Sequence, residues 1–282
     1  MRTIVRIILA AAGVLAVAGC SLATMAYNNA PSMTLYALND YFDLSAEQEA
    51  WLKPRLNGFI AWHRANELPI YRGLLNEASR QVESGVHNEE VRAFYVNGRM
   101  RLERAADHAL PDITAFLAQL TPQQIARMES KMAVDNRKME EEARVPAVER
   151  QQQRVEKSLL RIEDWFGPLS MTQTAKIRAV LSTMPPLDEM RIADRKRRQT
   201  EFIALLKAAP DAQTMQTALR WMLLQPERGR DAVFQAELDR QLDSTLTLVK
   251  SLLADAAPAQ RARVQKRLNG YAGDIDSLLR SG

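Results

Sequence analysis

The stretch PAQRARVQKRLNGYAGDIDSLLR, residues 258–280, carries the pattern that decides the fold class. Its apolar residues step by four, three, four and three positions: Val264, Leu268, Tyr271, Ile275 and Leu278. This spacing puts them on one face of an α-helix. Because a single helix of this kind is marginal in water, it needs partners that cover the apolar stripe. We therefore expect 258–280 to be a helix packed against other helices.

The same period recurs in 88–106, 147–166 and 230–256, whereas sustained apolar–polar alternation typical of strands is nearly absent. We predict an all-α, multi-helix bundle of about nine or ten helices, several of them long, with no sheet. Prolines mark the breaks, and Pro54 and Pro69 indicate that 46–82 is kinked or split. We expect residues 34–282 to form one helical domain, with a soft boundary near 167–170.

The N-terminus has the layout of a bacterial lipoprotein signal. Arg2 and Arg6 precede an apolar stretch over 7–17, and Val17-Ala18-Gly19-Cys20 reads as a lipobox. We expect a signal peptide over 1–19, cleavage between Gly19 and Cys20, lipidation of Cys20, and a lipidated tether over 20–33. Two or more acyl chains give stable anchoring. An ordinary secretory signal with a chance cysteine, or an uncleaved anchor, is the alternative.

These features place the expected mature chain in the cell envelope, with the membrane as a partner through the lipid. Ser21 after the lipidation site favours the periplasmic face of the outer membrane. Loss of 1–19 removes two Arg and no acid, so the formal charge falls from +4 to +2. That charge excludes a nucleic-acid footprint. Cys20 is the only cysteine, so the mature chain has no thiol left for disulfides or thiolate catalysis.

A five-residue pattern recurs at the start of several predicted helices: LSAEQ at 44–48, LTPQQ at 120–124 and LSMTQ at 169–173, with a degraded copy, AAPAQ, at 256–260. It has the form of a capping box, in which a Ser or Thr hydroxyl accepts from the N3 amide and the N3 Gln reaches back. The expected N-cap and N3 residues are Ser45 with Gln48, Thr121 with Gln124, and Ser170 with Gln173.

This pattern resembles the LTxxQ motif of Spy- and CpxP-like periplasmic proteins, which are helical chaperones and stress modulators of the bacterial envelope. A second resemblance lies in 26–31 (AYNNAP), 40–44 (DYFDL) and 62–71 (WHRANELPIY). These segments are similar to a family of bacterial lipoproteins whose domain has no known function. This second resemblance implies a lipid-anchored helical protein and carries no reaction.

The sequence offers few groups for catalysis. His63 and Glu67 are four residues apart and could share a helix face as metal ligands, but a hydrogen-bonded pair on a half-buried face is the favoured interpretation. The motifs GxSxG, HExxH, GxxxxGK[ST] and GxGxxG are absent from the sequence. We therefore expect a protein that is not an enzyme and has neither cofactor nor metal.

Two surfaces are candidates for contact with other proteins. One side of the predicted helix 122–144 carries three methionines, Met128, Met132 and Met139. If they are exposed, they offer a flexible binding surface, and if they are buried, they belong to the core. The core interpretation is favoured. The second surface is a helix face that carries Arg191, Arg195 and Arg198. This face could contact acidic partners or lipid headgroups. The alternative is a solvated face whose charge is balanced by nearby acids.

The sequence favours a non-catalytic protein-binding role, chaperone-like or as an envelope scaffold, with other envelope proteins as clients. An enzyme acting on cell-wall or lipid substrates is the alternative. A cleft with convergent acids around His63 and Glu67 would favour the enzyme, and an exposed apolar concave helical face would favour the binding protein. A closed bundle with a polar surface would favour neither and would leave a partner-specific scaffold.

Overall fold

The computed structural model describes residues 20–85 and 88–281, and within these ranges the chain forms twelve helices and no strand. The prediction of an all-α bundle is confirmed, with more helices than the nine or ten expected. The helices are α2 (Cys20–Asn28), α3 (Ala30–Phe42), α4 (Ala46–Asn66), α5 (Leu68–Ser84), α6 (Asn88–Leu117), α7 (Pro122–Ala143), α8 (Ala147–Phe166), α9 (Met171–Ser182), α10 (Asp188–Ala208), α11 (Ala212–Leu224), α12 (Ala232–Ala254) and α13 (Pro258–Arg280).

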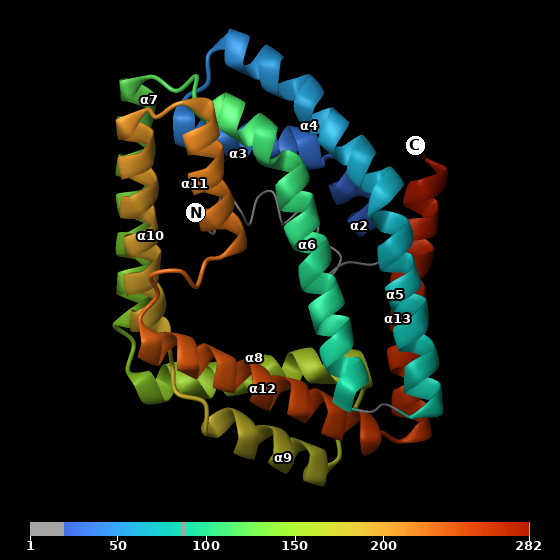
Figure 1. Ribbon diagram of the computed structural model, residues 1–282. Coiled ribbons are helices and arrows are strands. Elements are labelled where there is room, and N and C mark those ends of the chain that lie inside the picture. Colours follow the sequence, from blue (N-terminus) through green and yellow to red (C-terminus); the bar gives the residue numbers. More distant parts are fainter. Residues whose placement is uncertain (1–19, 86–87, 282) are drawn as a thin grey trace.

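The helices are arranged along a four-sided outline, called the frame below, and α6 crosses it diagonally (Figure 1). The pairs α7 with α10 and α5 with α13 form the two long sides. Helices α3 and α4 lie across one end, and α8, α9 and α12 lie at the other. Helix α6 runs between these ends, packing against α12 near its start and against α11 and α4 further along.

The apolar core is divided among the corners of this frame. The largest cluster joins α3, α4, α7, α10, α11 and the last part of α6 around Phe42, Met128 and Phe202. A second joins α5, α8, α9, α12 and α13 around Ile177 and Leu252. A third, smaller cluster joins α2, α5 and α13. The middle of α6 belongs to none of these clusters.

Residues 20–33 are helical, whereas we expected a tether. Tyr27 and Ala30 are buried, and α2 packs against α13. Asn29 interrupts the helix only slightly, because its N–H still donates to the Met25 carbonyl and its own carbonyl still accepts from the Met33 N–H. Pro31, which has no N–H to donate, explains the break at this point. The segment is therefore part of the fold and not a flexible linker.

The segment 46–82 is split, as the two prolines indicate. Pro54 lies inside α4, which continues through it, and the chain breaks at Glu67 instead. Pro69 is in the first turn of α5, where a missing N–H costs little. The break gives α5 its own direction along α13.

The recurring five-residue motif caps helices and also joins them. The hydroxyls of Ser45, Thr121 and Ser170 accept from the N3 amides of α4, α7 and α9, and the N3 glutamines accept from the cap residues' own N–H groups. In the degraded copy Ala257 has no hydroxyl, so only the second half remains: its N–H donates to Gln260 Oε1 at 3.0 Å.

The four N3 glutamines pair two by two across the fold. Gln48 Nε2 donates to Gln124 Oε1 at 3.1 Å, and Gln124 Nε2 donates back to Gln48 Oε1 at 2.6 Å. Gln173 and Gln260 exchange the same two bonds, at 3.0 and 3.1 Å. All four side chains are buried. The motif therefore ties the start of α4 to that of α7, and the start of α9 to that of α13.

Candidate binding groove

The middle of α6 is an exposed helix with apolar side chains on more than one side. Between Val91 and Arg104 no residue is buried. The large apolar side chains here are 36–48% exposed: Phe94, Tyr95, Val96, Met100 and Leu102. Apolar groups gathered this densely on a surface are typical of a binding site.

One side of α6 forms a wall of a groove. Tyr95 and Leu102 line it together with residues from the end of α11 and from α12, around a cavity of about 500 Å³. The apolar residues of the opposite walls are Leu223, Leu224, Leu238 and Leu242. Val96 and Met100, four residues apart, share another side of α6. The volume of this groove lies within the range of ligand-binding pockets in proteins.

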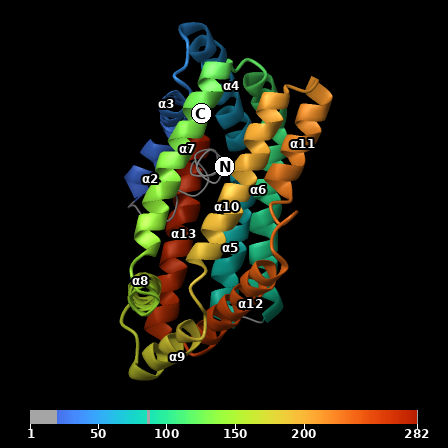
Figure 2. The ribbon, with the colours of Figure 1, turned by 90° about the vertical axis from the view of Figure 1, so that its left-hand side faces the viewer.

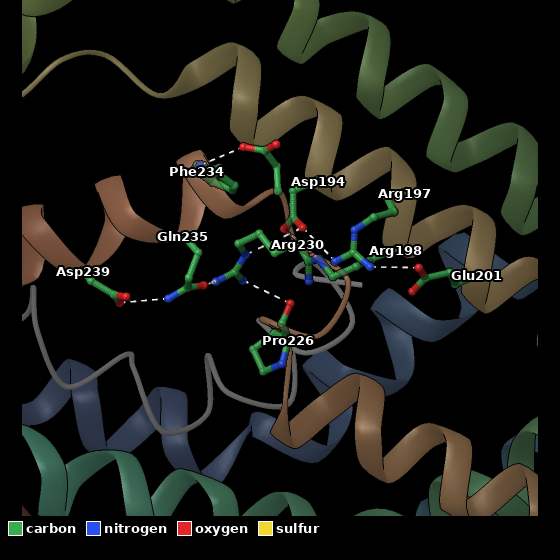
Figure 3. Close-up of polar contacts among 10 residues, drawn as sticks. Asp194, Arg197, Arg198, Glu201, Pro226, Arg230, Phe234, Gln235 and Asp239 are labelled. Carbon is green, nitrogen blue, oxygen red and sulfur yellow. Dashed lines mark hydrogen bonds and ion pairs between the residues drawn. The ribbon is translucent and has the colours of Figure 1, made fainter.

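Polar side chains follow the edge of this groove. Arg99 Nε donates to Glu103 Oε1 at 2.8 Å on α6. Across the groove, Arg230 Nη1 donates to Gln235 Oε1 at 2.5 Å, and Gln235 Nε2 donates to Asp239 Oδ1 at 2.8 Å (Figure 3). Charges of both signs therefore surround an apolar floor, which is the usual anatomy of a protein-binding surface.

A buried charge cluster fixes the loop that carries Arg230. The Asp194 carboxylate accepts from Arg197 Nη2 at 2.8 Å and from Arg198 Nε at 3.0 Å, and it lies 3.7 Å from Arg230 Nε (Figure 3). Arg197 also donates to Glu201. These contacts offset part of the cost of removing the charges from water. The cluster connects α10 with the turn between α11 and α12.

The same contacts correct our interpretation of the arginine face on α10. Arg195 and Arg198 are buried, and Arg191 is half-buried, so they do not form an exposed contact surface. Arg195 Nε donates to Asn136 Oδ1 on α7 at 2.9 Å. Burial lowers the pKa of the Arg198 guanidinium. Counting acids nearby in the sequence did not reveal that Asp194 would draw these side chains inward.

The methionines of α7 are also placed inside. Met128 and Met132 are buried in the largest core cluster, and Met139 is half-buried. The prediction of a methionine contact surface is therefore wrong for Met128 and Met132, and the core interpretation holds for them. Their partners include Tyr41 and Phe202 in the same cluster.

Charged and aromatic contacts hold α6 in place. Glu67, at the break between α4 and α5, is completely buried, with Arg104 Nε 3.1 Å from its Oε1 and Arg101 Nη1 3.9 Å from its Oε2. Neither contact is aligned as a hydrogen bond, so the attraction is mainly electrostatic. Trp62 stacks on His108 of α6 with ring centroids 3.7 Å apart. Both contacts arise from the segment WHRANELPIY.

Further ion pairs connect α6 to the helices that form the groove. Arg92 Nη2 is 2.6 Å from Asp243 Oδ1 on α12. Arg220 Nη2 on α11 is 3.0 Å from Asp107 Oδ2. Exposed pairs of this kind contribute little stability each, but together they define where α6 lies relative to α11 and α12.

His63 and Glu67 do not form the pair that we expected from their spacing. Both are buried, and the Glu67 carboxylate oxygens accept no hydrogen bond, so the side chains of His63 and Glu67 are not bonded to each other. His63 Nδ1 lies 3.0 Å from the Tyr27 hydroxyl instead. Among the described residues, no three His, Cys, Asp or Glu side chains come together as metal ligands.

Burial dominates the acid–base behaviour of this cluster. It lowers the pKa of His63 to about 4, so the ring is neutral near pH 7. It raises the pKa of Tyr27 and of Tyr71 to about 12 each. These side chains connect α2, α4 and α5. Tyr27 and His63 are buried and Tyr71 is half-buried, which suits a structural role.

The expected lipidation site lies at the edge of the described structure. Gly19 and the expected signal peptide over 1–19 are outside the described residues, and Cys20 is the first residue of α2. Among the residues that the structure describes, no helix is long and apolar enough to cross a membrane.

Sequence reasoning missed the apolar residues of α6 that matter here. The stripe of Val91, Tyr95 and Leu102 predicted one apolar face to be covered by neighbours. Val96 and Met100 give α6 a second apolar side, and Phe94 adds an apolar group away from both sides. Apolar residues on more than one side of a helix that is also rich in charge were the available signal.

Comparison with known proteins gives a family and no activity. A family model described as Family of unknown function (DUF6279) matches residues 40–230. The match covers more than half of the chain, so the chain belongs to this family. The search of curated proteins and the search of solved structures each found no match.

Proposed function

We propose that this member of the DUF6279 family is a lipid-anchored, non-catalytic binding protein of the bacterial envelope, which holds apolar segments of other proteins along α6. The observation that carries the proposal is the exposed middle of α6, with Phe94, Tyr95 and Met100 open to solvent. Together with the groove that Tyr95 and Leu102 line, these exposed apolar side chains favour a binding protein over an enzyme.

The shape of the groove supports a polypeptide client. Its floor is apolar and its edge carries the ion pair Arg99–Glu103 on one side and Arg230 on the other. Apolar side chains of a client would be buried on the floor while its backbone and polar groups meet the charged edge. Because the exposed residues differ in shape and include a flexible methionine, they suit clients of varied sequence.

The anchor proposal rests on the sequence around Cys20 and on Ser21, which favour a lipidated protein on the periplasmic face of the outer membrane. An anchored chain searches only a thin layer above the membrane, so its effective concentration near membrane-associated clients is raised. Replacing Cys20 with Ala should abolish incorporation of a labelled fatty acid in cells, and persistent labelling would contradict the anchor.

The alternative of a cell-envelope enzyme gains no support from the acids around His63. Glu67 is the one carboxylate in direct contact with Arg101 and Arg104 there, and it is completely buried. A substrate would reach it only after α6 moved away. A scaffold that binds one partner in the same groove remains compatible with these contacts, and the experiment below separates it from a general chaperone.

The proposal is tested by the ability of the soluble body, residues 21–282, to prevent aggregation of a denatured model client without ATP. We expect suppression at about an equimolar ratio, since one groove serves one apolar segment. The variant Phe94→Gln/Tyr95→Gln/Met100→Gln should lose most of it. Glutamine retains helix propensity, so the variant removes apolar surface without breaking α6.

The matched control is Val148→Gln/Leu160→Gln/Met171→Gln on α8 and α9, which removes three side chains that are even more exposed. It should suppress aggregation as well as the wild type. Equal losses in both variants would show nonspecific binding to exposed apolar side chains and would contradict binding along α6. No suppression by the wild type would reject the chaperone form and leave a scaffold with a specific partner.

A further inference from the structure

We propose that the outer face of α2 and α3 docks directly on a lipid bilayer, so that the body sits on the membrane with the α6 groove turned away from it. This inference rests on the proposed anchor at Cys20. It goes beyond anchoring, because a lipidated chain with a flexible tether would leave the orientation of its body undefined.

The first observation is the absence of charge. From Cys20 to Asn39 the sequence contains no Asp, Glu, Lys or Arg, although 26% of the whole chain is charged. Charged side chains are the main cost of placing a protein surface against lipid. The segment that immediately follows the expected lipidation site is thus the one long uncharged stretch in the mature sequence.

The second observation is which side chains this segment exposes. Met25 and Met33 are 56% exposed and Tyr36 is 79% exposed. They are eight and then three residues apart, so on a nearly continuous helix they lie along one side. Tyrosine is enriched where a protein meets the headgroup region of a membrane, and apolar side chains of an interfacial helix reach the acyl boundary.

The third observation is that this face has a fixed position. The opposite side of the same helices is buried through Tyr27, Ala30, Thr34 and Leu38. The Tyr27 hydroxyl is bonded to His63 on α4. Met25, Met33 and Tyr36 therefore lie on the side of these helices that faces away from the body of the protein.

The proposed anchor at Cys20 lies close to the exposed face of α2 and α3. Cys20 is the first residue of α2, and a helix rises ~1.5 Å per residue, so Met25 lies roughly 8 Å along the axis from Cys20. Acyl chains attached at residue 20 would hold Met25 at the depth of the headgroups. The anchor itself therefore brings a lipid bilayer into contact with this face.

The fold then defines an orientation. Helices α2 and α3 lie at one side of the molecule, and α11 and α12 lie at the opposite side (Figure 2). The groove is formed by α6 with α11 and α12. With α2 and α3 on the bilayer, the groove opens toward the periplasm, where unfolded or partner chains reach it.

The test uses the fact that Cys20 is the only cysteine of the chain, so a thiol reagent reacts at one position. The chain from residue 20 is coupled through the Cys20 thiol to maleimide lipids in phosphatidylethanolamine–phosphatidylglycerol vesicles, which imposes anchoring whether or not cells lipidate this residue. An environment-sensitive fluorescent amino acid replaces Tyr36, or, as the control, Val233 on α12, which is 66% exposed. Lipids carrying a spin label near the headgroup report contact by quenching.

We expect the emission at position 36 to shift to the blue and to be quenched by spin-labelled lipid, and the emission at position 233 to remain that of a water-exposed group. Equal, water-like emission at both positions would overturn the docking face. A change at position 36 that follows the density of protein on the vesicle and not the spin label would assign the face to a second copy and also overturn it. The fatty-acid labelling of Cys20 and the aggregation assay report on the anchor and the groove separately.

Discussion

The reciprocal pair of Gln48 and Gln124 gives a sharp prediction about what the recurring motif contributes. The Gln48 side chain takes part in four hydrogen bonds: two with Gln124, one donated to the Gln119 carbonyl and one accepted from the Ser45 N–H. A net hydrogen bond contributes about 1 kcal/mol, and a buried group left without a partner costs about 1–3 kcal/mol. We therefore expect Gln48→Ala to lower the free energy of unfolding by about 3 kcal/mol.

Urea unfolding of the soluble body, followed by circular dichroism, measures this loss. Once Gln48 is gone, Gln124 has already lost its partner, so Gln48→Ala/Gln124→Ala should cost less than the sum of the single changes, by about 1–2 kcal/mol. Gln123→Ala is the control, because its side chain is exposed on the same turn. A loss below about 0.5 kcal/mol for Gln48→Ala, or strict additivity, would show that the pair is incidental to stability.

Three further predictions concern single buried side chains. Glu67→Gln removes the charge that faces Arg101 and Arg104. Amide hydrogen exchange in the middle of α6 should therefore rise, and the free energy of unfolding should fall by about 2 kcal/mol. Unchanged exchange in α6 would contradict the role of Glu67 in holding this helix. His63 has a folded pKa of about 4 against an ordinary 6.5, so its contribution is fully present above pH 6.5 and is lost as the pH falls toward 4, by up to about 3 kcal/mol. His63→Gln should therefore lose less stability than the wild type between pH 6.5 and 4, and equal losses would contradict the buried neutral ring. Met128→Ala should lower the free energy of unfolding in urea by about 3 kcal/mol, because this side chain lies in the core. Aggregation suppression under native conditions should stay intact. A loss of suppression without a loss of stability would favour the methionines of α7 as a contact surface.

Local chemistry predicted much of the fold. The stripe of Val264, Leu268, Ile275 and Leu278 is buried in the structure, because a helical period fixes which residues share a face. The hydroxyl and glutamine at Ser45 and Gln48 define where α4 begins, since both groups act within one turn. Features that depend on three or four consecutive residues are readable from sequence.

Features that depend on distant partners were not readable. Gln48 meets Gln124 across 76 positions, and nothing in either copy of the motif indicates which copies pair. Arg195 and Arg198 looked like an exposed face because charge favours solvent, yet Asn136 and Asp194 satisfy them inside. The exposure of Phe94 on α6 likewise follows from how the frame is assembled, and not from the helix itself.

The most direct test of the binding proposal is to map where a client touches the protein. A photo-crosslinking phenylalanine derivative is placed at Tyr95 in the α6 groove, or at Val233, which is more exposed but lies outside the groove. Each purified body is mixed with a permanently unfolded client and irradiated. A client bound along α6 predicts a strong crosslink from position 95 and little from position 233, although chance encounters favour the more exposed site. Crosslinks of equal yield at both positions, or a stronger one at position 233, would contradict the groove as the binding site.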